Sequence, residues 1–181
     1  SAILDRRTRD CRLDLDEARL REDLGQFLTP PHVAEFMASL FARLPGEVEL
    51  LEAGAGAGAL TSAFVRRACS LPVRPKRIRV TAFEVDARIL DRLRSTLADC
   101  ARLCKQEGVA FGAVVRHEEF IGSVVPAVRG EWFAPALPSF NVAIVNPPYR
   151  KIRGDSATRL LLRSAGIETI NLYTGFLALI A

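Results

Sequence analysis

Side chains that bind metals or carry redox chemistry are scarce in this sequence. Its 181 residues include two histidines and four cysteines. No CxxC pair and no HExxH pattern occurs, and the spacing of Cys100 and Cys104 places both thiols on one face of a helix rather than in a metal site. These patterns predict that the protein has no metal centre and that its cysteines are reduced and mostly buried.

Long apolar segments and long blocks of one charge are also missing. No run of 18 apolar residues and no signal-peptide pattern occurs, which predicts a cytoplasmic protein without membrane association. The 25 basic and 21 acidic residues are interleaved and give a net charge of +4. Such a charge permits a polyanionic partner such as nucleic acid without requiring one.

What the sequence does contain is a regular alternation of predicted strands and helices. This alternation predicts an α/β fold, in which helices cover both faces of an open, mainly parallel sheet. Ligands of such folds bind at the carboxyl ends of the strands. We expect strands at 48–51, 77–85, 111–116 and 140–145, and helices at 13–24, 32–41, 59–67, 87–106, 156–164 and 168–181.

The predicted elements also suggest how the chain is divided. Residues 1–46 form an N-terminal helical segment in which Thr29 is expected to cap the helix that follows, and residues 47–181 form the α/β domain. Only four strands can be counted, and the stretch at 173–181 is apolar. We therefore expect a fragment of a larger protein, one that could associate with itself through this apolar end.

Residues Asn146, Pro147, Pro148 and Tyr149 follow the apolar run at 140–145. Proline lacks an N–H group and fixes φ near −65°, so two in a row make a stiff turn whose carbonyls are free to accept hydrogen bonds. At the end of a buried strand, this turn presents an amide, a carbonyl and a ring, which suits the binding of a planar amino group. Asn-Pro-Pro is also an ordinary strand-terminating turn, so the motif alone does not decide.

A glycine-rich loop follows the first predicted strand. Gly54, Gly56 and Gly58 alternate with alanines there. Such a turn lets a ligand approach the backbone closely, and it can offer backbone amides at the start of a helix. The ligand indicated is a nucleotide or S-adenosylmethionine (AdoMet).

Acidic residues follow the next two strands. Glu84 ends the second predicted strand, where a carboxylate can accept hydrogen bonds from ribose hydroxyls, and Glu119 and Phe120 follow the third, where they can contact an adenine. The Asn-Pro-Pro-Tyr segment gives a dinucleotide-binding enzyme no obvious benefit. It does suit an enzyme that holds a methyl donor beside an amino group. The combination favours AdoMet.

Taken in order, these segments resemble the N6-adenine DNA methyltransferases whose AdoMet motifs precede the catalytic motif, including the Eco57I-type restriction-modification methylases. The resemblance extends from about Gly25 to Phe176. This chain has Ala53-Gly54-Ala55 where relatives often have Pro-Ala-Cys, and Glu119 where an aspartate is usual. The matching segments are GQFLTPP at 25–31, EAGAG at 52–56, FEVD at 83–86, EEFI at 118–121, NPPY at 146–149 and NLYTGF at 171–176.

The resemblance implies a Rossmann-like AdoMet-dependent methyltransferase domain at 47–181 that lacks the family's later strands and its target-recognition domain. It implies double-stranded DNA as a partner, and a restriction endonuclease that is either separate or fused. It also implies that AdoMet is the cofactor and that the residues holding it are Thr29, Glu52, Gly54, Gly56, Glu84, Glu119 and Phe120.

The resemblance assigns catalysis to the Asn-Pro-Pro-Tyr segment, Asn146, Pro147, Pro148 and Tyr149. The exocyclic N6 of adenine is a poor nucleophile because its lone pair is delocalised into the ring. We expect Asn146 Oδ1 and the Pro147 carbonyl to accept its two hydrogens, so that the lone pair turns toward the methyl donor. Tyr149 would stack on a base flipped out of the duplex. Because the DNA-reading part is missing, we expect weak or absent turnover from these 181 residues alone, even if the parent protein is active.

Other functions remain open. Protein-glutamine and RNA-guanine methyltransferases also use NPPY, and an inactive AdoMet-binding module is a third alternative. Single residues have alternatives too. Thr29 either caps a helix or contacts the ligand. The basic residues Arg150, Lys151 and Arg153 either contact phosphates or form a charged surface loop. We expect Trp132 and Phe133 to cover the sheet rather than to gate a pocket.

Overall fold

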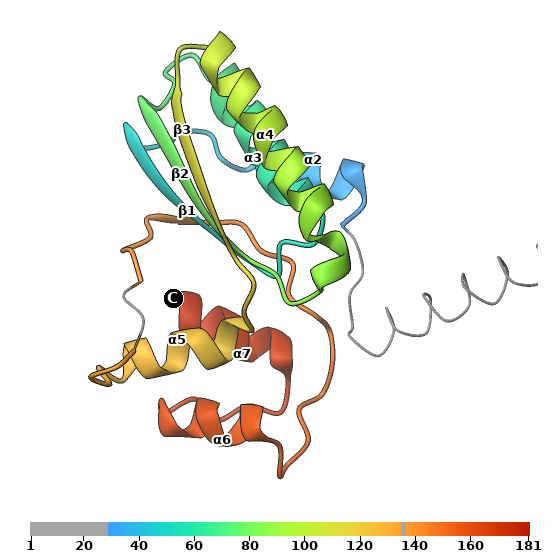
Figure 1. Cartoon of the computed structure of the whole chain (residues 1–181), viewed down its shortest axis with the longest axis vertical. Coiled ribbons are helices and arrows are strands. Elements are labelled where there is room, and N and C mark those ends of the chain that lie inside the picture. Colours follow the sequence, from blue (N-terminus) through green and yellow to red (C-terminus); the bar gives the residue numbers. More distant parts are fainter. Residues whose placement is uncertain (1–28, 135–136) are drawn as a thin grey trace, which may run out of the picture.

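A computed structural model describes residues 29–134 and 137–181. Cys11, the predicted helix at 13–24 and residues 25–28 of the first matching segment lie outside the described residues. Four strands form one sheet in the order β3-β2-β1-β4, and every pair is parallel (Figure 1). The predicted parallel α/β sheet is confirmed. The strands are β1 (Glu47–Ala53), β2 (Arg77–Phe83), β3 (Ala110–Arg116) and β4 (Val142–Ala143).

One face of the sheet is covered by three helices, α2 (Pro31–Ser39), α3 (Ala59–Ser70) and α4 (Leu90–Gln106), the last preceded by the short 3-10 helix η1 (Ala87–Ile89) (Figure 1). Because successive side chains of a strand point to opposite faces, alternate residues of β1 and β2 contribute to this core. They pack with the fully buried Phe64 of α3 and Leu93 of α4.

The second face is covered only near the carboxyl ends of the strands. Helices α5 (Phe120–Val128), α6 (Ala157–Ser164) and α7 (Leu172–Ile180) gather there (Figure 1), and their apolar side chains pack with Leu51 and Phe83 of the sheet. The prediction of helices on both faces is therefore right for one whole face and for part of the other.

The amino-terminal part of that second face carries ion pairs instead of a helix. Arg77 lies 3.3 Å from Glu47, and Arg79 contacts both Glu47 and Glu49. These side chains come from neighbouring parallel strands in register. Charged side chains at alternate strand positions make this part of the face polar, so it has no apolar surface for a helix to cover.

Helix α5 was missing from the predicted elements. It contains Pro126, which normally argues against a helix, and it begins directly after Glu119, whose side chain caps it. Trp132 and Phe133, in the segment that follows, are 96% and 99% exposed. The prediction that these two rings cover the sheet is wrong, because α5 and α7 already occupy the place that they would fill.

Several element boundaries also differ from those predicted, among them those of α2, β4 and α7. Pro30, not Thr29, is the N-cap of α2, and the fourth strand is limited to Val142–Ala143. Helix α7 begins at Leu172 because Asn171 is extended and pairs with Lys151.

The described cysteines are free and buried, as predicted: Cys69, Cys100 and Cys104. Burial raises the pKa of Cys100 to about 11 and that of Cys104 to about 12, so these thiols carry little thiolate and are poor nucleophiles. Within residues 29–134 and 137–181, no helix is both long and apolar enough to cross a membrane.

The strand order places a topological switch point beside β1. The chain proceeds from β1 to β2 on one side, whereas β4 pairs with β1 on the other side. Connections that leave in opposite directions open a crevice at the carboxyl ends of the strands, which is where open α/β sheets bind ligands.

Gly58, the N-cap of α3, allows a stability prediction. Its φ is +81°, and an added Cβ would lie 3.0 Å from Leu93 Cδ1 and 3.1 Å from Thr96 Cγ2. We expect Gly58→Ala to lower the free energy of unfolding by about 2–4 kcal/mol, because it combines left-handed strain with overpacking. Urea denaturation followed by circular dichroism measures this loss.

Gly108 provides the matched control. Its φ is +73°, but an added Cβ would meet nothing within 4 Å. Gly108→Ala should therefore cost only the backbone strain, about 1 kcal/mol. Equal losses in the two variants would show that the contacts of Gly58 with α4 contribute nothing.

Candidate active site

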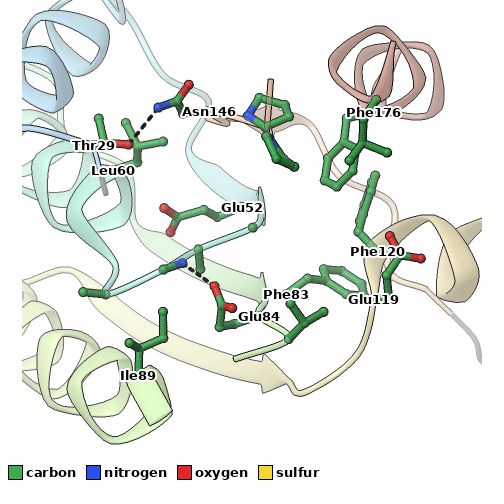
Figure 2. A pocket seen from close by; sticks show the side chains of 18 of the residues that line it. Thr29, Glu52, Leu60, Phe83, Glu84, Ile89, Glu119, Phe120, Asn146 and Phe176 are labelled. Carbon is green, nitrogen blue, oxygen red and sulfur yellow. Dashed lines mark hydrogen bonds between the residues drawn. The ribbon is translucent and has the colours of Figure 1, made fainter. Parts of the chain in front are cut away.

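All eleven residues predicted to bind the cofactor or the acceptor group line one pocket at the carboxyl ends of the strands. Figure 2 shows Glu52 and Glu84 between Asn146 and Ile89, with Phe120 and Phe176 forming the opposite wall. Four further lining residues were not predicted, although two of them, Phe83 and Phe176, lie in matching segments; the four are Leu60, Phe83, Ile89 and Phe176. The eleven predicted residues are Thr29, Glu52, Gly54, Gly56, Glu84, Glu119, Phe120, Asn146, Pro147, Pro148 and Tyr149.

The glycine loop turns sharply between β1 and α3. Gly54, Gly56 and Gly58 have φ values of 76°, 56° and 81°, a region that residues with a side chain rarely adopt. The Gly58 amide donates to the Ala55 carbonyl at 2.9 Å, which closes the turn. Alternate glycines are therefore required by the backbone itself and not only by the close approach of a ligand.

Three more amides of this loop are also bonded within the protein. Gly54 and Ala55 both donate to the Phe83 carbonyl, at 3.0 and 2.8 Å. Gly56 donates to Glu84 Oε2 at 2.7 Å. The expectation that the loop offers free amides to a ligand is wrong for these positions, because the end of β2 takes them.

Glu84 is held firmly at the end of β2. Its side chain is 2% exposed, and Oε1 accepts a second hydrogen bond from the Asp86 amide at 2.7 Å (Figure 2 shows the bond to the glycine loop). A carboxylate oxygen can accept more than one hydrogen bond, so these contacts orient the group without preventing it from binding a ligand.

Glu52 ends β1 in a drier environment. It is 1% exposed and accepts a hydrogen bond from the Thr61 hydroxyl of α3. Burial raises the pKa of Glu52 to about 8, despite the opposing hydrogen bonds from Thr61. The carboxyl group is therefore largely protonated at neutral pH.

Asn146 is oriented by Thr29. Asn146 Nδ2 donates to Thr29 Oγ1 at 3.1 Å (Figure 2), which leaves Asn146 Oδ1 directed elsewhere. Among the described residues, no donor bonds to Asn146 Oδ1 or to the Pro147 carbonyl, whereas the Pro148 carbonyl accepts from the Arg150 amide at 3.2 Å. Two acceptor oxygens in succession are thus available at the end of β4.

Aromatic side chains form the wall of the pocket that lies opposite Glu52 and Glu84 (Figure 2). The Phe120 ring is buried and lies edge-on to Phe83 at 5.3 Å and tilted against Phe176 at 5.0 Å. Glu119 accepts from the amides of Ile121 and Gly122, at 3.1 and 2.6 Å. Phe120 and Glu119 therefore have structural roles in the core and at the start of α5, and both still line the pocket.

The pocket is acidic. Four carboxyl groups line it, and Arg150 is the sole lysine or arginine among the described lining residues. No group of three metal-binding side chains occurs in the part of the chain that the structure describes. The four are Glu52, Glu84, Glu118 and Glu119.

Two curated proteins share sequence with most of this chain. It is 39% identical over 165 residues to the type II methyltransferase M.PstI of Providencia stuartii, which covers 91% of this chain and 31% of that protein. It is 36% identical over 162 residues to the type II methyltransferase M.BsuBI of Bacillus subtilis, with 88% and 31% covered. The chain is therefore similar in sequence to part of two type II methyltransferases. It spans about a third of their length, and no protein-family model matches it.

Solved structures share the fold. The modification subunit of a candidate type I restriction enzyme from Vibrio vulnificus matches 92% of this chain, and 34% of its own length, with a TM-score of 0.55 at 19% identity. A candidate class I S-adenosylmethionine-dependent methyltransferase from Listeria monocytogenes matches 87% of this chain, and 43% of its own length, with a TM-score of 0.52 at 12% identity. The predicted Rossmann-like methyltransferase fold and the resemblance to restriction-modification methylases are confirmed.

The pKa of Glu52 leads to a pH prediction. Between pH 4.5 and about 8, the Glu52 carboxyl group keeps its proton in the folded protein but loses it in the unfolded chain. Glu52 should therefore lower the free energy of unfolding by about 1.4 kcal/mol per pH unit between pH 4.5 and about 8. Glu52→Gln removes this titration and keeps an oxygen for Thr61. Its stability relative to wild type should rise from pH 5 to pH 8 in urea denaturation, and a difference independent of pH would contradict the raised pKa.

Proposed function

We propose that residues 47–181 belong to the catalytic domain of a restriction-modification DNA methyltransferase, preceded by an N-terminal segment at 1–46. The reaction is transfer of a methyl group from AdoMet to N6 of an adenine flipped out of duplex DNA. The observation that carries this proposal is the pair of available acceptors, Asn146 Oδ1 and the Pro147 carbonyl, at the end of β4 in an acidic pocket.

Two properties of the pocket favour AdoMet over a dinucleotide. Loops that bind pyrophosphate use free backbone amides, and here Gly54, Ala55 and Gly56 donate within the protein. The carboxylates that line the pocket besides the protonated Glu52 would repel phosphates and attract a cation. AdoMet carries a sulfonium and an ammonium group, so its charge complements this lining.

The residues present fit the parts of AdoMet. Glu84 would bind the ribose hydroxyls, and Phe120 with Phe176 would contact the adenine ring from the aromatic wall. Glu52, which lies between Glu84 and Asn146, would face the cationic methionine part (Figure 2). AdoMet supplies an electrophilic methyl group to a nucleophile placed beside it.

The acceptor half of the site prepares that nucleophile. Asn146 Oδ1 and the Pro147 carbonyl accept the two hydrogens of the adenine amino group, which draws the nitrogen toward a tetrahedral geometry. The prolines cannot adjust φ, and Thr29 holds the Asn146 amide, so these acceptors are preorganised. Tyr149, 64% exposed at the pocket rim, offers a ring on which the base can stack.

The relatives favour DNA over other acceptors. Both curated homologues are type II methyltransferases, and one structural neighbour is a modification subunit of a restriction enzyme. Lys151 and Arg153 lie exposed just beyond Tyr149 and make no ion pair within the described residues, so they can contact backbone phosphates. A restriction endonuclease, separate or fused, is the partner that such a function implies.

A transfer assay tests the function. The full-length protein is incubated with methyl-labelled AdoMet and duplex DNA of varied sequence, and the DNA is digested to nucleosides. We expect N6-methyl-2′-deoxyadenosine from wild type, and about 100-fold less from Asn146→Ala, because that variant loses a preorganised acceptor. Calorimetry should show that both proteins bind AdoMet and that neither binds NAD.

The identity of the labelled product separates the alternatives. Label in cytosine would overturn the adenine assignment, and label in RNA or in a protein glutamine would replace the DNA function with that of the other NPPY enzymes. Binding of AdoMet without transfer to any acceptor would indicate an inactive binding module.

Thr29 gives a second, more specific prediction. Thr29→Val keeps the shape of the side chain but removes the acceptor for Asn146 Nδ2. The amide is then free to turn, so kcat should fall about tenfold while the KM for AdoMet changes little. Thr29→Ser keeps the hydroxyl and should remain close to wild type in the same kinetic assay. Equal kcat values for the serine and valine variants would refute the orienting role.

A further inference from the structure

The Tyr149 ring stacks on the ring of Tyr173. The two centroids lie 4.9 Å apart, and the planes are inclined by 17°. Tyr149 lines the pocket, whereas Tyr173, the second residue of α7, does not. Tyr173 therefore covers one face of the Tyr149 ring, and because Tyr149 remains 64% exposed, its ring still has surface for a planar partner.

The backbone fixes this pairing. Residues 150–152 and 170–172 form a short antiparallel bridge, in which Lys151 pairs with Asn171. The Ile152 amide donates to the Ile170 carbonyl at 2.7 Å, and the Leu172 amide donates to the Arg150 carbonyl at 3.0 Å. This bridge brings Tyr149, two residues before Lys151, close to Tyr173, which lies two residues after Asn171 in the first turn of α7, and the two rings meet there.

Further contacts hold Tyr173 in place. Asn171 caps α7 by accepting from the Tyr173 amide at 3.0 Å. The neighbouring Leu172 and Phe176 are buried and line the pocket. The helix that positions Tyr173 therefore also supplies the aromatic wall, so the Tyr149 ring is oriented relative to the rest of the pocket.

We propose that Tyr173 is a positioning residue for the acceptor base: it supports Tyr149 so that the exposed surface of that ring is ready to stack on a planar ring. This inference rests on the proposed function. A rim tyrosine that was free to rotate would lose conformational entropy each time a base bound, and Tyr173 removes part of that cost in advance. The acceptor that suits such a stack is a nucleobase rather than a side-chain amide.

Kinetics of the full-length protein test the proposal. Tyr173→Leu keeps apolar volume without a ring, and Tyr173→Phe keeps the ring without the hydroxyl. We expect Tyr173→Leu to lower kcat/KM for DNA by about twofold to tenfold, and Tyr173→Phe to restore the wild-type value. The Kd for AdoMet and the melting temperature should not change. Tyr173→Met serves as a second ringless variant if the leucine protein does not fold.

A double-mutant cycle separates positioning from general packing. Because Tyr173 acts through Tyr149, replacing Tyr173 by leucine should have no further effect in a Tyr149→Leu background. A wild-type value of kcat/KM in the ringless variants, an equal loss in Tyr173→Phe, or an undiminished loss in the Tyr149→Leu background would each overturn the inference alone. Label transferred by the wild type to protein glutamine and not to DNA would instead overturn the proposed function, and the base-stacking role with it.

Discussion

The buried carboxylate of Glu84 joins the two strand ends on which the site depends. Its oxygens accept from the amides of Gly56 and Asp86, both at 2.7 Å, so the turn after β1 is tied to the end of β2. Leaving a buried carboxylate without donors would be costly, which is why this contact determines the path of the glycine loop. The Phe83 carbonyl takes two more amides of that loop. The loop thus gives most of its donors to the protein, and the acidic groups of the pocket come from residues outside the loop.

The Asn-Pro-Pro-Tyr segment, which supplies the proposed acceptors, is held in place differently from the glycine loop. The Asn-Pro-Pro turn contains two residues without N–H groups, so these two residues donate no backbone hydrogen bonds that could hold it. It is positioned instead by side chains distant in sequence. Thr29, 117 positions before Asn146, orients the amide, and Tyr173 of α7 stacks on Tyr149. The turn supplies stiffness, and the elements before and after it supply orientation.

Much of this arrangement follows from local sequence patterns. Parallel strands end at a common edge, so residues placed after β1, β2, β3 and β4 had to converge, and all eleven predicted site residues line one pocket. Helix α5 could not be predicted, because Pro126 interrupts its pattern and its cap, Glu119, also matched a ligand-binding motif. The Thr29 contact and the pairing of Tyr149 with Tyr173 depend on tertiary register, which periodicity does not encode. The same is true of the loop amides, whose acceptors lie on another strand.

The charge of the site also depends on what occupies it. Burial raises the pKa of Glu52 to about 8, so in the absence of a neighbouring cation this wall of the pocket is largely uncharged at neutral pH. A positively charged ligand beside Glu52 favours the carboxylate and lowers its pKa, because the new attraction offsets the cost of burial. Binding of a cation would then release a proton, whereas a neutral or anionic ligand gains nothing from the exchange. A buried acid of this kind discriminates by charge without presenting a permanently exposed carboxylate, and the cationic cofactor proposed here is the ligand that it favours.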